Sequence, residues 1–177
     1  PILLTTSLFL LIKSLYRSLY YDCMGSVIWI LNSYGVFLVI FLTILFLAYK
    51  KDQTLLFNCL TSLAVTLLVT VVLKELVDRP RPYELYEVVS AAGADYLPSF
   101  PSGHAALSFA LATSVVLRRR VIGGVLLFLA TIFSLGRVVA LVHYPTDIAF
   151  GMLVGVSVAL FVDRYKVQVS LKRKKRG

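Results

Sequence analysis

Cysteine and histidine are scarce in this sequence, and each shortage excludes a class of chemistry. The two cysteines, Cys23 and Cys59, form no metal-binding or redox spacing, and we interpret both as packing residues. No cluster of cysteine and histidine and no group of several carboxylates indicates a metal centre, so we expect no metal and no other cofactor. The two histidines, His104 and His143, are the only imidazoles available for acid–base or nucleophilic chemistry.

Apolar residues are abundant instead. They make up 59% of the 177 residues, and the mean hydropathy of +0.86 lies far above that of a soluble domain. Apolar runs predict membrane-spanning helices over residues 26–49, 54–77, 103–117, 121–142 and 145–162. Residues 1–12 are too short to cross a bilayer, because a span needs about 20 helical residues. The sequence predicts a single all-α domain over residues 1–177, a polytopic transmembrane bundle of about six helices whose first helix is truncated or interfacial.

Turn-forming and helix-capping residues set the expected ends of two of these helices. The polar stretch from Asn32 to Gly35 interrupts the first long run, so we expect an interfacial helix to about Asn32 and then a span to Tyr49. Pro145 is suited to the first turn of the last helix, because its missing N–H has no partner there. We expect that helix to end near Val162, before the basic tail.

The net charge of +9 is unevenly distributed along the chain. Twelve of the 18 basic residues are expected on one membrane face, namely Lys50, Lys51, Arg118, Arg119, Arg120, Arg164, Lys166, Lys172, Arg173, Lys174, Lys175 and Arg176. Short loops rich in lysine and arginine mark the cytoplasmic side of a membrane protein. We therefore expect a multi-pass protein of the cell membrane with a cytoplasmic C-terminus. The lipid bilayer, and not nucleic acid, is the expected partner of this charge.

The stretch Ser99 to His104, Ser-Phe-Pro-Ser-Gly-His, resembles a binding site for an anion. Pro101 ends the preceding segment, and Ser102 is a good N-cap for the apolar helix that follows. The backbone N–H groups of Gly103 and His104 would then lie at the positive end of the helix dipole, where they favour a phosphate-like group. His104 is placed to pass a proton to a group held there.

Lys74, Arg79 and Arg81 lie where the second long run leaves the membrane, on the face where positive charge is disfavoured. A single cation at a helix end usually reaches for the lipid headgroups and carries no function. Three cations within eight positions favour a phosphate site instead, since arginine grips phosphate oxygens with a bidentate fork. Arg137 lies inside an apolar helix, where burial without a partner is costly, and a bound phosphate is one candidate partner.

His143 and Asp147 are separated by four residues at the start of the last helix. A carboxylate there can accept an imidazole N–H and leave the other ring nitrogen as a nucleophile. Alternatively, Asp147 only caps its helix beside a surface histidine. The two histidines and the cations are all expected at the same membrane face. Together they supply a nucleophile, an acid and charge stabilisation for phosphoryl transfer.

These residues form three ordered motifs that resemble those of the type-2 phosphatidic acid phosphatases, a family similar to vanadium haloperoxidases and glucose-6-phosphatase. Lys74, six residues and Arg81-Pro82 match the first motif, and Pro101 to His104 match the second. The third motif is matched by Arg137, His143 and Asp147, with Gly136 in place of the family's serine. The resemblance extends to the membrane undecaprenyl- and dolichyl-diphosphate phosphatases and implies a six-helix membrane fold.

The resemblance also implies a mechanism. His143 would attack phosphorus and form a phosphohistidine, Asp147 would orient it, and His104 would protonate the leaving oxygen. The residues implied to stabilise the phosphoryl oxygens are Lys74, Arg81, Ser102, Gly103 and Arg137. Arg79 and Pro101 are interpreted as auxiliary, and the missing hydroxyl at Gly136 is expected to weaken phosphate binding at most.

We therefore expect a metal-independent lipid phosphatase with its site at the extracytoplasmic face. An isoprenoid diphosphate carrier lipid is the favoured substrate, because recycling such a carrier releases phosphate on that side. Phosphatidate, phosphatidylglycerol phosphate and diacylglycerol pyrophosphate stay open. Two other functions also stay open: a lipid phosphotransferase that uses the same histidines, and a catalytically inactive membrane protein that binds lipid phosphates. A transporter is disfavoured, since the charged residues cluster near one end of the spans.

Overall fold

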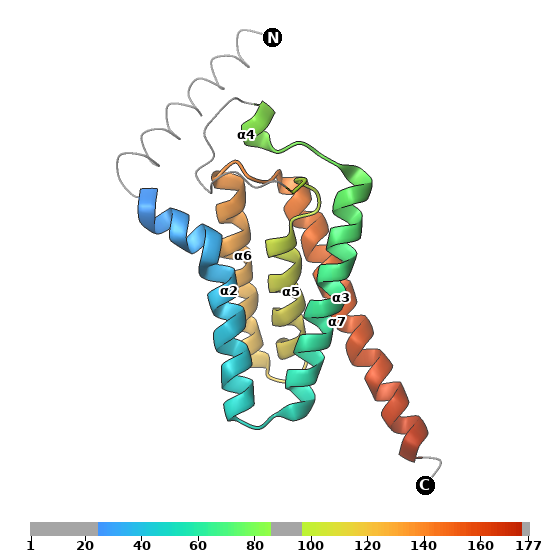
Figure 1. Ribbon diagram of the computed structural model, residues 1–177. Coiled ribbons are helices and arrows are strands. Elements are labelled where there is room, and N and C mark those ends of the chain that lie inside the picture. The colour runs from blue at the N-terminus through green and yellow to red at the C-terminus, as the bar shows by residue number, and fades with distance from the viewer. Residues whose placement is uncertain (1–24, 86–96, 175–177) are drawn as a thin grey trace.

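A computed structural model describes residues 25–85 and 97–174, in which the regular elements are all helices and there is no strand. The helices are α2 (Gly25–Tyr49), α3 (Gln53–Val77), α4 (Pro82–Leu85), α5 (Gly103–Val116), α6 (Arg120–Val139) and α7 (Pro145–Lys174) (Figure 1). Three segments are long and apolar enough to cross a membrane: Gln53–Glu84, Arg120–Val139 and Pro145–Tyr165. Shorter apolar helices cover Tyr34–Tyr49 and Gly103–Val116. The all-α prediction is confirmed, while the count of six spans stays a prediction, and residues 1–12 lie outside the described residues.

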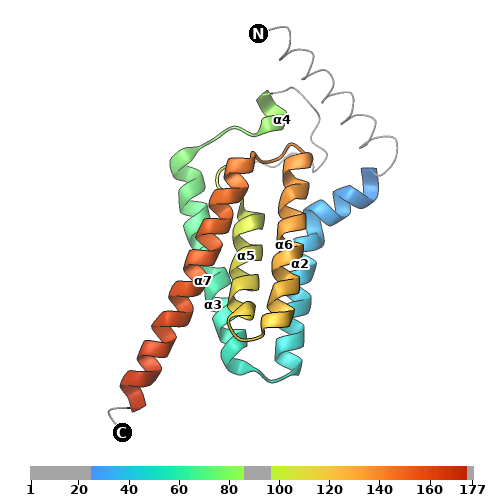
Figure 2. The ribbon, with the colours of Figure 1, turned by 180° about the vertical axis from the view of Figure 1, so that it is seen from behind.

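Helix α5 occupies the middle of the bundle, between α2 and α6 on one side and α3 and α7 on the other (Figures 1 and 2). Its closest neighbour is α7, because two glycines bring the backbones together. A Cβ atom on Gly155 would lie 2.2 Å from the carbonyl oxygen of Ala106, and one on Gly151 would lie 2.5 Å from that of Ser102. This spacing of small residues, one turn apart, lets two helices touch at the backbone. It fixes the N-terminal ends of α5 and α7 against each other.

The structure corrects two expected helix boundaries. Helix α2 continues through Asn32 to Gly35 without a break, and Figure 1 shows it bending in its first part instead. A Cβ atom on Gly35 would lie 2.9 Å from the ring of Phe133, so this glycine serves close packing against α6. Helix α7 continues past Val162 to Lys174. Basic residues end a membrane span but not a helix, because lysine and arginine have high helix propensity.

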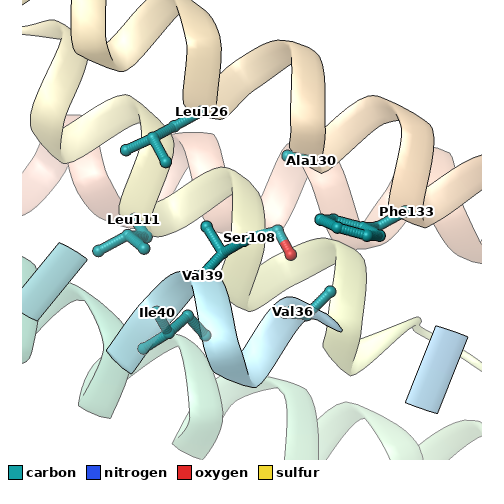
Figure 3. A pocket seen from close by; sticks show the side chains of 8 residues that line it. All are labelled: Val36, Val39, Ile40, Ser108, Leu111, Leu126, Ala130 and Phe133. Carbon is teal, nitrogen blue, oxygen red and sulfur yellow. The ribbon is translucent and has the colours of Figure 1, made fainter. Parts of the chain in front are cut away.

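Helix α2 packs around an apolar pocket that it shares with α5 and α6 (Figure 3). The lining residues are Val36, Val39, Ile40, Ser108, Leu111, Leu126, Ala130 and Phe133. Cys59 is a free, buried cysteine in the adjoining apolar core, as expected of a packing residue. Cys23 lies outside the described residues.

The two ends of the bundle differ in chemistry. The turns around residues 50–52 and 117–119 lie together at one end, and the segments that carry the three motifs lie at the other (Figures 1 and 2). The side of the membrane that each end faces stays a prediction. The arrangement nevertheless separates the basic turns from the candidate site by the full length of the central helices.

Candidate active site

The three motifs converge because each lies where a helix begins or ends. Lys74 is in the last turn of α3, Ser102 caps the start of α5, and Arg137 is in the last turn of α6. The backbone N–H of Ser102 donates a hydrogen bond to the carbonyl oxygen of Asp147, 3.1 Å away, and so joins the second motif to the third. The buried members of the candidate site are Lys74, Arg81, Pro101, Ser102, Arg137, His143 and Asp147.

His143 lies in the turn between α6 and α7 and is only 2% exposed. Its backbone N–H donates to the carbonyl oxygen of Arg137 at 3.3 Å. Its Nδ1 atom lies 3.7 Å from Oδ2 of Asp147, which is an ion-pair distance but too long for a hydrogen bond. The histidine and the carboxylate are neighbours, as the sequence predicts, but a third side chain comes closer to both.

That side chain is Ser99. Its hydroxyl donates to Oδ2 of Asp147 at 2.5 Å and lies 3.4 Å from Nδ1 of His143. Ser99 is fully buried. Ser99 lies in the stretch before His104, and the sequence predicts no role for it. Its only signal was its position three residues ahead of Ser102, which says nothing about contact with a helix that begins more than 40 residues later.

The Asp147 carboxylate is also held by two other donors. Nη1 of Arg79 donates to Oδ1 at 2.8 Å, and the backbone N–H of Tyr144 donates to Oδ2 at 3.0 Å. The bond from Tyr144 caps α7, so the capping alternative is correct as far as it goes. The histidine beside it, however, is buried rather than on the surface. The Asp147 carboxylate therefore both caps α7 and contacts the imidazole of His143.

Arg79 has a more direct place than its auxiliary assignment implied. Besides Asp147, its Nη1 donates to Oγ1 of Thr146 at 2.9 Å, and its guanidinium carbon lies 3.8 Å from the centre of the Tyr144 ring. That distance is typical of an arginine stacked on an aromatic face. Arg79 thus holds the start of α7 through its contacts with three residues there. It also lines a cleft of about 270 Å³, together with Asp78, Pro80, Glu84, Leu97 and Pro98.

Lys74 and Arg81 tie the segment before the second motif to the site. The ammonium of Lys74 donates to the carbonyl oxygen of Pro98. Nε of Arg81 donates to that of Leu97 at 2.9 Å, and Nη1 donates to that of Val142 at 3.1 Å. Arg81 thus contacts the residue before His143, Lys74 contacts the residue before Ser99, and the charges of both cations act on His143. Their predicted role in binding phosphate oxygens stays a prediction, as does that of Arg137.

The environment of His143 favours a neutral imidazole. Burial lowers the pKa of His143 to about 4, the Asp147 carboxylate opposes this, and the charges of Arg81, Arg137 and Lys74 lower the pKa further. A neutral imidazole has a lone pair on one nitrogen and is the nucleophilic form. At neutral pH, His143 is therefore in the state that attack on phosphorus requires.

The start of α5 leaves room beside the second histidine. The Ser102 hydroxyl is buried and accepts from the backbone N–H of Ala105 at 3.5 Å, as expected of the N-cap. A Cβ atom on Gly103 would have no heavy atom within 4 Å, so there is open space in front of this backbone. The ring of His104 lies edge-on to Phe37 of α2, with ring centres 5.3 Å apart. Gly136, which has no hydroxyl to offer, lies in the last turn of α6.

Within residues 25–85 and 97–174, no group of three or more histidine, cysteine or acidic side chains could hold a metal ion. Four cations, Lys74, Arg79, Arg81 and Arg137, gather instead around His143 and the carboxylate of Asp147. This arrangement offers a nucleophile that is oriented by a carboxylate and surrounded by positive charge, which is suited to attack on an anionic phosphorus centre.

Comparisons with known proteins identify a family and a fold. The model of the PAP2 superfamily matches residues 55–169. The chain is 42% identical over 64 residues to the bacitracin transport permease protein BcrC of Bacillus licheniformis, a match covering 36% of this chain and 32% of that protein. The chain thus spans about a third of that relative's length. It resembles the crystal structure of Aquifex aeolicus LpxE with a TM-score of 0.69, over 86% of this chain and 94% of that one. At 23% identity, this second likeness establishes the fold.

Proposed function

The chain belongs to the PAP2 superfamily, and from that premise we propose that it is an integral membrane lipid phosphatase acting through a phosphohistidine intermediate. The observation that carries the proposal is the state of His143. It is buried and neutral, lies 3.7 Å from the Asp147 carboxylate, and is subject to the positive charges of Lys74, Arg81 and Arg137. A buried imidazole among cations is poorly placed to hold a proton but well placed to attack a phosphate.

The proposed reaction has two steps. In the first, the lone pair on Nε2 of His143 attacks the terminal phosphorus, the bond from that phosphorus to the oxygen that joins it to the rest of the lipid breaks, and His104 gives that oxygen its proton. In the second, His104 takes a proton from water, the oxygen attacks phosphorus, and the bond between phosphorus and nitrogen breaks. Phosphate is released together with the shortened lipid, which is a lipid monophosphate when the substrate is a diphosphate and a lipid alcohol when it is a monoester. Both imidazoles return to their starting states.

The cations stabilise the charge that develops on the phosphoryl oxygens. We assign this work to Lys74, Arg81 and Arg137 together with Ser102 and the backbone N–H of Gly103 at the start of α5. Because three fixed cations can neutralise this charge, we propose that the reaction needs no metal ion. Asp147 keeps His143 in place, and Arg79 keeps Asp147 in place.

The proposed substrate is an isoprenoid diphosphate carrier lipid, and the proposed site of reaction is the extracytoplasmic face. The distribution of basic residues supports this side, since the basic turns lie at the end of the bundle opposite to the motifs. The C-terminal end of α7 would then lie in the cytoplasm, and residues 1–177 would form one membrane domain. Phosphatidate and related phospholipid phosphates are the competing substrates.

The first test measures the release of phosphate. Purified protein in detergent with EDTA is given a polyprenyl diphosphate or phosphatidate, and released phosphate is compared between wild type and His143→Ala. We expect release that survives EDTA and is lost in the variant. Loss of activity with EDTA would overturn the metal-free mechanism. Transfer of phosphate to an added alcohol instead of water would favour the phosphotransferase, and binding without release would favour an inactive lipid-binding protein.

A substrate with a good leaving group distinguishes the roles of the two histidines. An aryl phosphate needs little help from an acid, so His104→Ala should still form the phosphohistidine but hydrolyse it slowly. Protein given the radiolabelled aryl phosphate should be quenched in alkaline detergent, because acid hydrolyses the bond between phosphorus and nitrogen. It should then retain more label in His104→Ala than in wild type, and none in His143→Ala. Label in His143→Ala would contradict the assignment of the nucleophile.

A further inference from the structure

Ser99 lies between the two residues that the proposed mechanism pairs. Its Oγ atom is 2.5 Å from Oδ2 of Asp147 and 3.4 Å from Nδ1 of His143, whereas those two atoms are 3.7 Å apart. The carbonyl oxygen of Val142 lies 3.5 Å from the same hydroxyl, at the limit of a hydrogen bond. The shortest connected path from carboxylate to imidazole therefore passes through the serine.

The hydrogen bonds available to Ser99 determine the tautomer of His143. A serine hydroxyl has one hydrogen to donate, and the carboxylate of Asp147, which can only accept, takes it at 2.5 Å. Toward His143 the same oxygen can then only accept, so Nδ1 must carry the hydrogen. In a neutral imidazole this leaves Nε2 without one and with its lone pair available.

We propose that Ser99 is a positioning residue that links Asp147 to His143 and holds the imidazole in the tautomer and orientation needed for attack by Nε2. The inference rests on the proposed phosphatase function and deepens it. Ser99 does not touch the reacting phosphorus. It acts through His143, by a chain of hydrogen bonds from Nδ1–H to Oγ and from Oγ–H to the carboxylate.

The backbone around Ser99 is built to hold it still. Its N–H donates to the carbonyl oxygen of Arg79 at 2.8 Å, and the side chain of Arg79 binds the other oxygen of Asp147. The two preceding residues are fixed as well, since Lys74 binds the carbonyl oxygen of Pro98 and Arg81 that of Leu97. A serine held through its own N–H and through the two residues before it can fix an imidazole to within the fraction of an ångström that attack geometry requires.

The charged groups that face His143 set the expected effect of removing this hydroxyl. They are Asp147 of α7, Lys74 of α3, Arg137 of α6 and Arg81 of the segment after α3. Without Ser99 between them, the carboxylate can contact the imidazole directly. The cationic form would gain from this contact, so the acid limb of the pH profile should move to higher pH. The ring would also turn toward Asp147, away from the phosphate.

The test compares Ser99→Ala with Ser99→Thr and with Ser114→Ala. Ser114 is also buried, and its hydroxyl donates to Ser62, at 3.1 Å, far from the motifs along α5. We expect Ser99→Ala to lower kcat about 100-fold, the usual cost of a misplaced catalytic group, with KM changed less than threefold. Ser99→Thr keeps the hydroxyl and should stay within about tenfold of wild type, and Ser114→Ala within about threefold, given that lost buried hydrogen bonds act on stability.

Equal losses in Ser99→Ala and Ser99→Thr would overturn the inference, because packing and not the hydroxyl would then matter. So would an unchanged kcat in Ser99→Ala. If the added methyl of threonine prevents folding, Ser99→Cys decides instead: activity above that of the alanine variant supports the role of a donor, and activity equal to it refutes that role.

A spectroscopic test does not depend on turnover. With two histidines in the sequence, protein labelled with ¹⁵N-histidine gives signals from only two imidazoles, and His104→Gln identifies that of His143. We expect Nδ1 to be protonated and Nε2 unprotonated at neutral pH, and the titration of this ring to move to higher pH in Ser99→Ala. A protonated Nε2 would overturn the inference. Failure of wild type to hydrolyse any lipid phosphate would instead overturn the proposed function, and the tautomer would still be measured.

Discussion

The two ends of the bundle each carry an arginine–aspartate contact of nearly the same length, in very different surroundings. At the motif end, Arg79 and Asp147 are 2.8 Å apart, with side chains 34% and 0% exposed. At the opposite end, Arg119 and Asp52 are 2.7 Å apart, with side chains 45% and 25% exposed. Arg118 and Asp163, also at that end, form a similar exposed pair at 3.1 Å. Distance alone does not distinguish a functional contact from a solvated one.

The difference lies in what else each carboxylate touches. Asp52 accepts from Arg119 and from the backbone N–H of Leu55, where it caps α3, and water reaches the rest. Asp147 is closed off from solvent, and Arg79, Ser99 and Tyr144 all donate to it. An exposed pair contributes at most about 1 kcal/mol, whereas breaking a buried set leaves charge without compensation. Substitutions at the two ends should therefore have effects of very different size.

The largest contrast is expected between Asp147→Asn and Asp52→Asn. An amide at position 147 cannot balance the imidazolium-like charge of the reacting histidine and presents an N–H where Ser99 or Tyr144 now donates. We expect kcat for phosphate release to fall about 1,000-fold or more, as it does when a carboxylate behind a catalytic histidine becomes an amide. Asp52→Asn keeps an oxygen for its capping bond and should change kcat less than twofold. Comparable losses in both would contradict the division between the two ends.

The next contrast separates Arg79→Lys from Arg119→Lys. Lysine keeps the charge but loses the stacking on Tyr144 and cannot bind Thr146 and Asp147 with one planar group. We expect about a tenfold loss of kcat in Arg79→Lys and none in Arg119→Lys, measured as initial rates at saturating lipid. If Arg79→Lys is fully active, the planar guanidinium of Arg79 is not needed to hold Asp147, and the role of Arg79 is only auxiliary.

A smaller effect is expected in the pH dependence of the reaction. The pKa of His143 is lowered by burial from 6.5 to about 4, so its neutral form persists as the pH falls from 7 to 5. The acid limb of kcat/KM should therefore lie well below pH 6. The free energy of unfolding should depend on pH as well. The histidine of the unfolded chain takes up a proton below pH 6.5, whereas that of the folded chain does so only near pH 4. The folded state therefore loses stability as the pH falls from 6.5 to 4. An acid limb at 6.5 would contradict the buried state of His143.

The smallest effect is expected at the solvated end. The hydrogen bond from Arg119 lowers the pKa of Asp52 below its ordinary value of 3.8, so this pair supports the fold above that pH and is lost as the carboxylate is protonated. Because both side chains are exposed, Arg119→Ala should cost at most about 1 kcal/mol, seen as a small shift of Tm in detergent, and less still in 1 M salt. A shift of many degrees would show that this contact is structural.

The helices and the motifs could be predicted from the sequence, because both rest on short-range signals. Apolar runs define helices, Ser102 caps α5 through its own side chain, and Pro145 starts α7, all within one or two turns. The two wrong boundaries also have a local cause. Polar residues before Gly35 and basic residues after Val162 indicate where a chain leaves the membrane, and they do not by themselves end a helix.

The partners of Asp147 could be decided only by the tertiary structure. Ser99 and Arg79 lie 48 and 68 residues before it in the chain, and the bonds they make depend on positions within a few tenths of an ångström. Those positions follow from the close approach of α5 and α7 at Gly151 and Gly155, where any larger side chain would clash with backbone. The order of the residues specifies which chemical groups are present and at which helix ends they lie. The packing of the helices decided which of those groups touch, because hydrogen bonds form across space and not along the chain.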